Sequence, residues 1–176
     1  VKMKRFSYFL LAFAICASSV CSFAAVKLPK LISNGMVVQR GEPVKLWGWA
    51  DPGETVAVAA KSLVKKPKYK ASASAVADAD GKWEVELPAM PAGGPYAFTI
   101  GDVTVSDVLS GDVLLCSGQS NMQLPVNRVT DMFADEIAAY ENPQIRHFTV
   151  PNVVEFHQPA EDFPYGDWRA LTQDNV

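Results

Sequence analysis

Turn-forming residues recur at short intervals between positions 26 and 106, and this spacing constrains the fold more than any other feature of the chain. Asn-Gly, Gly-Glu-Pro, Asp-Pro-Gly, Asp-Gly and Gly-Gly-Pro sequences separate segments of only a few residues. Those segments alternate polar and apolar residues or are aromatic and β-branched, as strands are: 44–47, 55–58, 83–87 and 96–100. No helical period lies among them. The pattern predicts an antiparallel β-sandwich domain over residues 26–106.

The stretch 59–79 is rich in Ala, Ser and Lys, a composition that also suits a helix. Pro67 breaks any long helix, and strands flank the stretch on both sides. We therefore expect two strands joined by a tip that carries the basic cluster Lys65-Lys66-Pro67-Lys68. A solvated hairpin tip is favoured over a site for an anionic partner.

Three tryptophans in this region allow two interpretations. Aromatic faces are common in carbohydrate recognition, so Trp47, Trp49 and Trp83 could form a platform for stacked sugars. Trp47 and Trp49 share a strand face by the two-residue period, and the favoured interpretation is that they pack in the core of the sandwich or at an interdomain contact.

The second half of the chain opens with four consecutive apolar residues, 113–116. Such a run, without polar alternation, is typical of a short strand buried on both faces in a parallel sheet. Cys116 belongs to it and is expected to be an inert, buried thiol. Small and polar residues follow at once, and Gly118 allows a sharp turn at the carboxyl end of the strand, where open α/β sheets bind ligands.

Ser120 lies on this expected turn and is the candidate nucleophile. A serine in such a place is presented outward, and its backbone N–H can help to hold an oxyanion while a histidine removes the hydroxyl proton. The better-known nucleophile pattern, Gly-x-Ser-x-Gly, would require glycine where Met122 stands. Turns that contain Gly and Ser are common, so a turn without a catalytic role is the alternative.

A helix and a second strand are expected after this turn. Thr130 or Asp131 can cap a helix that runs to about Glu141, because Phe133, Ile137 and Tyr140 fall on one face. Residues 145–150 then form a strand, which gives the strand, helix, strand order of a βαβ unit. Residues 155–167 read as a surface loop, and Trp168 is expected to anchor its return.

The first 24 residues have the layout of a secretory signal peptide. Lys2, Lys4 and Arg5 precede an apolar run, 6–20, and small residues follow near Ala24, where cleavage is expected. The run is short for a membrane span, and a secreted or periplasmic location without a stable span is expected. A net charge of -3 with scattered basic residues excludes a nucleic-acid binder of the usual kind. No metal-ligand spacing is present, and no cofactor is expected.

The block Gly118-Gln119-Ser120-Asn121-Met122, with Gly111-Asp112-Val113 before it, resembles the first block of the sialate O-acetylesterase family, a branch of the SGNH-type hydrolases. Further blocks resemble that family in the same order: 34–40, 47–54, 80–83, 92–96 and 142–146. The resemblance implies that residues 107–176 are the start of a flavodoxin-like α/β esterase domain. It also implies hydrolysis of acetyl esters on sugar hydroxyls through an acetyl-serine intermediate.

The same resemblance assigns roles to the residues around Ser120. Ser120 matches the nucleophile and its backbone N–H one oxyanion donor; Gly118, Gln119 and Asn121 match the turn that shapes the site, with Gln119 or Asn121 as further donors. The family's base and acid form an Asp-x-x-His, which this sequence lacks. His147, inside an expected strand, and His157, in a loop, are interpreted as structural. The sequence therefore predicts an amino-terminal fragment, inactive alone.

The substrate is left open between acetylated sialic acid and another plant or host glycan. The alternative function is a non-catalytic carbohydrate-binding or structural β-sandwich module. A serine peptidase is a weaker third interpretation, because nothing in the chain indicates a peptide-binding edge.

Overall fold

The computed structural model describes residues 25–154 and 157–172, and the expected signal peptide lies outside them. Strands dominate the described part, with a few short helices near its carboxyl end. In chain order the elements are β1 (Val37–Gln39), β2 (Val44–Trp49), β3 (Thr55–Ser62), β4 (Lys70–Val76), β5 (Lys82–Leu87), β6 (Gly93–Ile100), β7 (Val103–Gly111), α1 (Ser120–Gln123), the 3-10 turns η1 (Val126–Arg128) and η2 (Thr130–Met132), α2 (Ala134–Ala139), β8 (Asn142–Phe148) and β9 (Trp168–Leu171).

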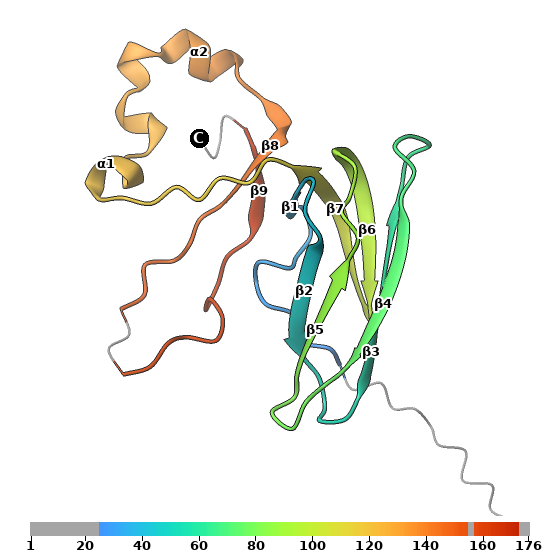
Figure 1. Ribbon diagram of the computed structural model, residues 1–176. Helices are drawn as coiled ribbons and strands as arrows, with labels where there is room; N and C mark the ends of the chain where they lie inside the picture. Colours follow the sequence, from blue (N-terminus) through green and yellow to red (C-terminus); the bar gives the residue numbers. More distant parts are fainter. Residues whose placement is uncertain (1–24, 155–156, 173–176) are drawn as a thin grey trace, which may run out of the picture.

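Two sheets carry the first part of the chain. The larger has the strand order β1-β7-β6-β3-β4, and β2 pairs with β5 in a separate two-stranded sheet (Figure 1). Both sheets supply side chains to one hydrophobic cluster, whose most buried large members are Tyr96, Phe98, Leu46, Leu87 and Ile100. The expected strands are thus confirmed. The prediction of a purely antiparallel arrangement is wrong, because β1 runs parallel to β7 and makes the larger sheet mixed; the sandwich architecture itself stays a prediction.

The alternation in β3 decides which face of the sheet is buried. Val56, Val58 and Ala60 are each 1% exposed, whereas the intervening residues face outward. This is the two-residue period of a strand with one face on the core. The hairpin of β3 and β4 is also as predicted, with residues 63–69 between the strands and Lys65, Lys66 and Lys68 exposed.

Strand β7 was not predicted, although it is the longest strand. Its pairing with β6 matches Phe98 with Val105 but Tyr96 with Val108, so β7 has one extra residue in this interval. Such a β-bulge reverses the inward and outward positions that follow it. Asp107, within the bulge, has a φ of 57°, which is uncommon for a residue other than glycine. The predicted domain boundary at 106 and 107 falls inside this uninterrupted strand.

The tryptophans lie differently from the favoured interpretation. Trp47 and Trp49 do share a strand face, but Val44, Leu46 and Gly48 occupy the buried face of β2, so Trp47 is 36% exposed. The Lys27 ammonium lies 4.9 Å from the centre of the Trp49 ring. Trp83 alone is in the core, 3% exposed, where a Cβ on Gly48 would come within 2.9 Å of its ring. Core packing is therefore wrong for Trp47.

Two core tyrosines give the fold a predictable response to alkali. The Tyr96 hydroxyl donates to the Pro91 carbonyl (2.6 Å) and the Tyr69 hydroxyl to that of Pro88 (2.7 Å). Burial raises the pKa of both hydroxyls, and for Tyr69 the neighbouring Tyr96 adds a smaller contribution. Unfolded tyrosines ionise near pH ~10. The neutral hydroxyls of Tyr69 and Tyr96 therefore contribute fully to folding stability below that pH, and this contribution is lost as the pH rises through their folded-state pKa.

We expect the urea midpoint of the chain to fall between about pH 9 and 11, and to fall less in the double variant Tyr69→Phe, Tyr96→Phe. Tyr165→Phe is the control, because Tyr165 is 65% exposed. If the urea midpoints of the chain and of the double variant fell equally with pH, the loss of stability could not be assigned to Tyr69 and Tyr96.

Beyond β7 the predicted βαβ unit is not formed. Residues 113–116 are not a strand: Val113, Leu114 and Leu115 are 44%, 83% and 90% exposed, and Cys116 is exposed too. A strand needs a hydrogen-bonded neighbour, and no described strand pairs with this run. The expected inert, buried thiol is thus corrected to an exposed one.

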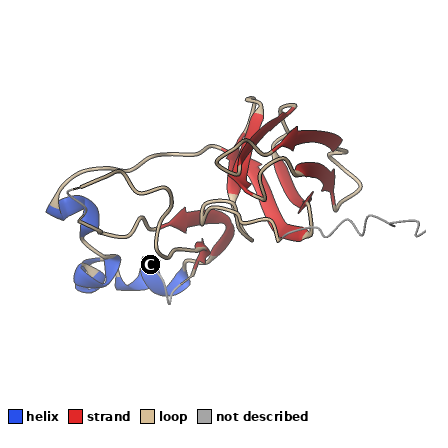
Figure 2. Cartoon of the chain, turned by 90° about the horizontal axis from the view of Figure 1, so that it is seen from below, coloured by secondary structure: helices blue, strands red, loops and turns tan. Residues whose placement is uncertain are grey.

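The expected helix and second strand are present in altered form. The helix is divided into η2 and the six-residue α2, neither with buried residues. The second strand is β8, which pairs antiparallel with β9 rather than parallel with an earlier strand. Seen from below, these helices gather at one end of the molecule and most of the strands at the other (Figure 2). Residues 155–167 form no helix or strand where they are described.

Candidate functional site around Ser120

Ser120 is the first residue of α1 and follows the extended segment 112–119 that leaves β7. Gly118, Gln119, Ser120 and Asn121 are all exposed. Among the described residues the Ser120 hydroxyl has no hydrogen-bond partner. The first N–H groups of a helix have no acceptor within it. The serine therefore presents both a free hydroxyl and a backbone donor to an incoming group.

The turn after Gln119 is built from the backbone. The Met122 N–H donates to the Gln119 carbonyl at 2.9 Å. Gly118 was expected to supply unusual backbone angles, but its φ lies outside the left-handed region. What requires glycine there is space, since a Cβ on Gly118 would lie 3.2 Å from the Met122 Cβ. Gly118 thus lets the segment pass close over the first turn of α1.

The start of this segment is fixed by β1. The Arg40 Nε donates to the Asp112 carboxylate at 2.8 Å, and the Val113 N–H donates to the Gln39 side-chain oxygen at 2.9 Å. The Arg40 N–H also donates to the Gly111 carbonyl. Gln39 and Arg40 end one of the sequence blocks that carried the family resemblance. Their contacts show that this block positions the segment leading to Ser120.

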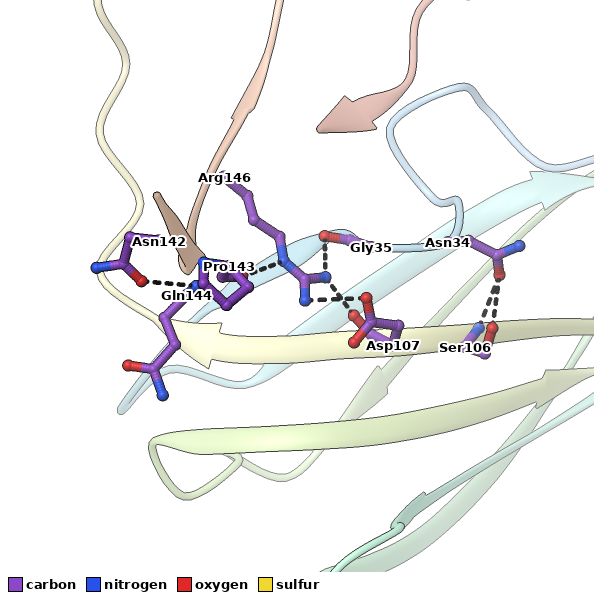
Figure 3. A network of polar contacts seen from close by, with 8 residues as sticks. All are labelled: Asn34, Gly35, Ser106, Asp107, Asn142, Pro143, Gln144 and Arg146. Carbon is purple, nitrogen blue, oxygen red and sulfur yellow. Dashed lines mark hydrogen bonds and ion pairs between the residues drawn. The ribbon is translucent and has the colours of Figure 1, made fainter. Parts of the chain in front are cut away.

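A second block with family resemblance, 142–146, contacts the block 34–40 and strand β7 through Arg146 on β8 (Figure 3). The Arg146 Nη1 donates to the Gly35 carbonyl (2.8 Å) and to the Asp107 carbonyl, and Nη2 forms an ion pair with the Asp107 carboxylate (2.9 Å). The Asn34 side-chain oxygen accepts from the Ser106 N–H at 2.8 Å. These partners satisfy backbone groups that the bulge removes from the ladder. The side chain of Arg146 is only 7% exposed.

The loop before β9 adds further contacts with the first part of the chain. The Trp168 Nε1 donates to the Leu31 carbonyl at 2.9 Å, and the Lys30 N–H donates to the Asp162 carboxylate at 3.1 Å. Glu161 forms an ion pair with Lys82 at 3.0 Å. Sequence reasoning anticipated an anchoring role for Trp168 but missed Arg146, Asn34, Gln39 and Arg40. Only the blocks shared with the family hinted at those four.

The structure does not join a base to Ser120. His147 is half-buried on β8, in register with Arg169 of β9, and His157 is exposed. Neither histidine makes a hydrogen bond with the Ser120 hydroxyl within the described ranges. The predicted turn residues and the serine are therefore together, whereas the rest of a catalytic triad is not assembled.

The described residues contain no group of three or more His, Cys, Asp or Glu side chains arranged to hold a metal ion. None of the helices in 25–154 and 157–172 has the length and apolar character needed to cross a membrane.

Comparisons with known proteins identify relatives. No protein-family model matches the chain. It is 33% identical over 163 residues to a sialate O-acetylesterase of Mus musculus, covering 82% of this chain and 28% of that protein. It is 34% identical over 162 residues to that of Homo sapiens, covering 82% and 29%. The crystal structure of a carbohydrate acetylesterase from Xanthomonas citri matches with a TM-score of 0.75 and 39% identity, over 86% of this chain and 33% of that chain.

This chain therefore shares its fold, over 86% of its length, with a carbohydrate acetylesterase, and its sequence relatives are acetylesterases too. The chain belongs to the sialate O-acetylesterase family, as the sequence blocks predicted. It spans about a third or less of the length of these relatives.

Proposed function

We propose that this chain is the serine-bearing part of a secreted or periplasmic carbohydrate O-acetylesterase. Ser120 Oγ attacks the acetyl carbonyl of an ester on a sugar hydroxyl and forms acetyl-serine, while the sugar oxygen leaves and takes up a proton. Water then releases acetate and regenerates the serine. The observation that carries this proposal is the exposed, unpartnered hydroxyl of Ser120 at the start of α1, in a chain related to acetylesterases.

The substrate follows from the names of the relatives, which act on sialate or carbohydrate acetyl esters. An acetylated sugar, either sialic acid or another glycan, is therefore the proposed substrate class. The backbone N–H of Ser120 is the proposed first donor to the oxyanion, and Gln119 and Asn121 are proposed to supply further donors from the same exposed turn.

A serine hydroxyl is a weak nucleophile without a base. Since neither His147 nor His157 is hydrogen-bonded to the Ser120 hydroxyl within the described residues, the proposed base and its orienting acid come from an Asp-x-x-His outside these 176 residues. The exposed run 113–116 fits such an arrangement, because it has the composition of a buried strand but lacks a paired neighbour here. The 176-residue chain alone is then expected to be inactive.

Acetate release from acetylated sugars and from 4-nitrophenyl acetate tests this proposal. The complete enzyme containing the chain should turn over both substrates. The 176-residue chain should release acetate no faster than a free thiol does. Because Cys116 is exposed, the difference between this chain and its Cys116→Ser variant shows how much of any residual rate comes from that thiol. Turnover by the short chain that requires Ser120 would show that a base is already present; absence of turnover by the complete enzyme would refute the proposal.

A non-catalytic carbohydrate-binding module is the second candidate, and one observation favours it. Trp47 is exposed on the outer face of β2, with Trp49 two residues along the same face. An exposed aromatic ring can stack against a sugar ring. Glycan binding that Trp47→Ala abolishes, together with a complete enzyme that releases no acetate, would favour this function over the esterase.

A further inference from the structure

The β3–β4 hairpin carries a concentration of positive charge that the esterase function does not use. Five of the 16 basic residues of the chain lie within positions 61–70, while none of its 19 acidic residues does. The five are Lys61, Lys65, Lys66, Lys68 and Lys70, and all are exposed. None forms an ion pair with another residue of the described ranges. In a chain of net charge -3, this hairpin is a local cationic surface.

Two aliphatic side chains stand among these lysines. Leu63 is 51% exposed and Val64 is 38% exposed, next to each other at the tip. Single exposed aliphatic residues are ordinary in proteins, but an adjacent pair flanked in sequence by five exposed lysines gives the tip an amphipathic surface. Long lysine stems allow the charged heads to spread sideways while an apolar centre is buried.

The tip is held in place by its own hydrogen bonds. The Ser62 hydroxyl donates to the Pro67 carbonyl (2.7 Å), and the Leu63 N–H donates to the Pro95 carbonyl (3.0 Å). Tyr69 anchors the return of the hairpin, because its ring packs edge-on against the buried Tyr96 with centroids 5.9 Å apart. Leu63 and Val64 are therefore exposed by a defined structure.

A hollow of about 300 Å³ lies at the base of the tip, lined by Ser62, Val64, Lys68, Tyr69 and Lys70. It combines two ammonium groups with an apolar wall. Phosphate oxygens fit the first set of groups and an acyl chain fits the second. One molecule that offers both is a phospholipid with an anionic headgroup.

We propose that the tip of the β3–β4 hairpin binds the surface of a bilayer that contains anionic phospholipids. Leu63 and Val64 enter the headgroup boundary, and the five lysines contact lipid phosphates. The exposed aliphatic pair favours a lipid surface over an anionic polysaccharide, which offers no acyl region. The hairpin lies on the side of the molecule away from α1, so this contact leaves Ser120 open to substrate (Figure 1).

The test is sedimentation of the 176-residue chain with vesicles of equal parts phosphatidylglycerol and phosphatidylcholine. Hydrogen exchange of residues 62–69 on the same vesicles reports on the tip itself, independently of the apolar run 6–20. The triple variant Lys65→Gln, Lys66→Gln, Lys68→Gln should bind on the order of 100-fold more weakly, at roughly a factor of five for each lysine near the surface. Leu63→Ser with Val64→Ser should weaken binding as well and remove the protection of the tip.

The matched control removes three cations elsewhere: Lys45→Gln, Arg128→Gln and Arg169→Gln. It should keep the binding and the tip protection of the parent, and exchange at β3 and β4 verifies that each variant is folded. Equal loss in the control and the tip variant would overturn the proposal, as would unchanged protection of residues 62–69 on vesicles. Tighter binding to soluble polygalacturonate than to vesicles would identify a polysaccharide partner and would overturn it too.

Discussion

Replacing Ser120 by alanine in the complete enzyme is expected to lower kcat by about 10⁴-fold or more. Without Oγ no acetyl-serine can form, and only the oxyanion donors and substrate binding remain to accelerate attack by water. Folding stability should be unchanged, because the side chain is exposed and its hydroxyl has no partner within the described part of the chain. Steady-state acetate release from an aryl acetate and from an acetylated sugar measures the loss.

Ser117 offers a matched control for this substitution. It is an exposed serine in the same extended segment, three residues before Ser120. Ser117→Ala should change kcat by no more than a few-fold, since Ser117 has no assigned role in the reaction. Full activity of Ser120→Ala, or equal losses in both variants, would end the case for Ser120 as nucleophile.

Replacing Arg146 by alanine is the structural change with the largest expected effect on stability, about 3 kcal/mol. The loss comes mainly from the carbonyls of Gly35 and Asp107, which would lose a charged donor, the Gly35 carbonyl in a partly buried place. The ion pair itself adds less, because the Asp107 side chain is 61% exposed. The damage should be local: amide protection in β8 and β9 falls by about two orders of magnitude, while β3 and β6 keep theirs.

Native-state hydrogen exchange measures this effect, and Arg169→Ala is the control on the neighbouring strand. Arg169 forms only an exposed ion pair with Asp167, so its removal should cost less than about 1 kcal/mol. Arg146→Lys should fall between the two, because one ammonium cannot replace both Nη1, which donates to the two carbonyls, and Nη2, which pairs with the Asp107 carboxylate. Similar exchange in Arg146→Ala and Arg169→Ala would show that the guanidinium does not join β8 to the bulge.

The sequence predicted those parts of the fold in which local pattern and tertiary packing agree. The alternation of β3 and β5 identified both strands, and Pro67 with its lysines located the hairpin tip. Strand β7 was not predicted because the bulge at Asp107 changes the phase of its inward-facing residues, which are Val103 and Val105 before the bulge and Val108 and Ser110 after it. A two-residue period cannot be followed through such a change.

The remaining differences between the predicted and the observed structure arise because contacts with residues outside a segment determine its structure. The run 113–116 has the composition of a buried strand, but composition cannot supply the neighbouring strands that make one. In β2 both faces contain apolar residues, so the shared face of Trp47 and Trp49 was predicted and its burial was not. Arg146 belongs to no recognisable sequence pattern, because its importance arises from carbonyls more than 30 residues away along the chain.

In the proposed mechanism Ser120 carries the acetyl group during turnover. Acid quenching of the complete enzyme as it hydrolyses 4-nitrophenyl acetate, followed by peptide mass spectrometry, detects this intermediate. We expect an acetyl group on Ser120 that forms and decays at rates compatible with turnover. Turnover without acetylation of Ser120, or with the acetyl group on Ser117 or Cys116 alone, would contradict it.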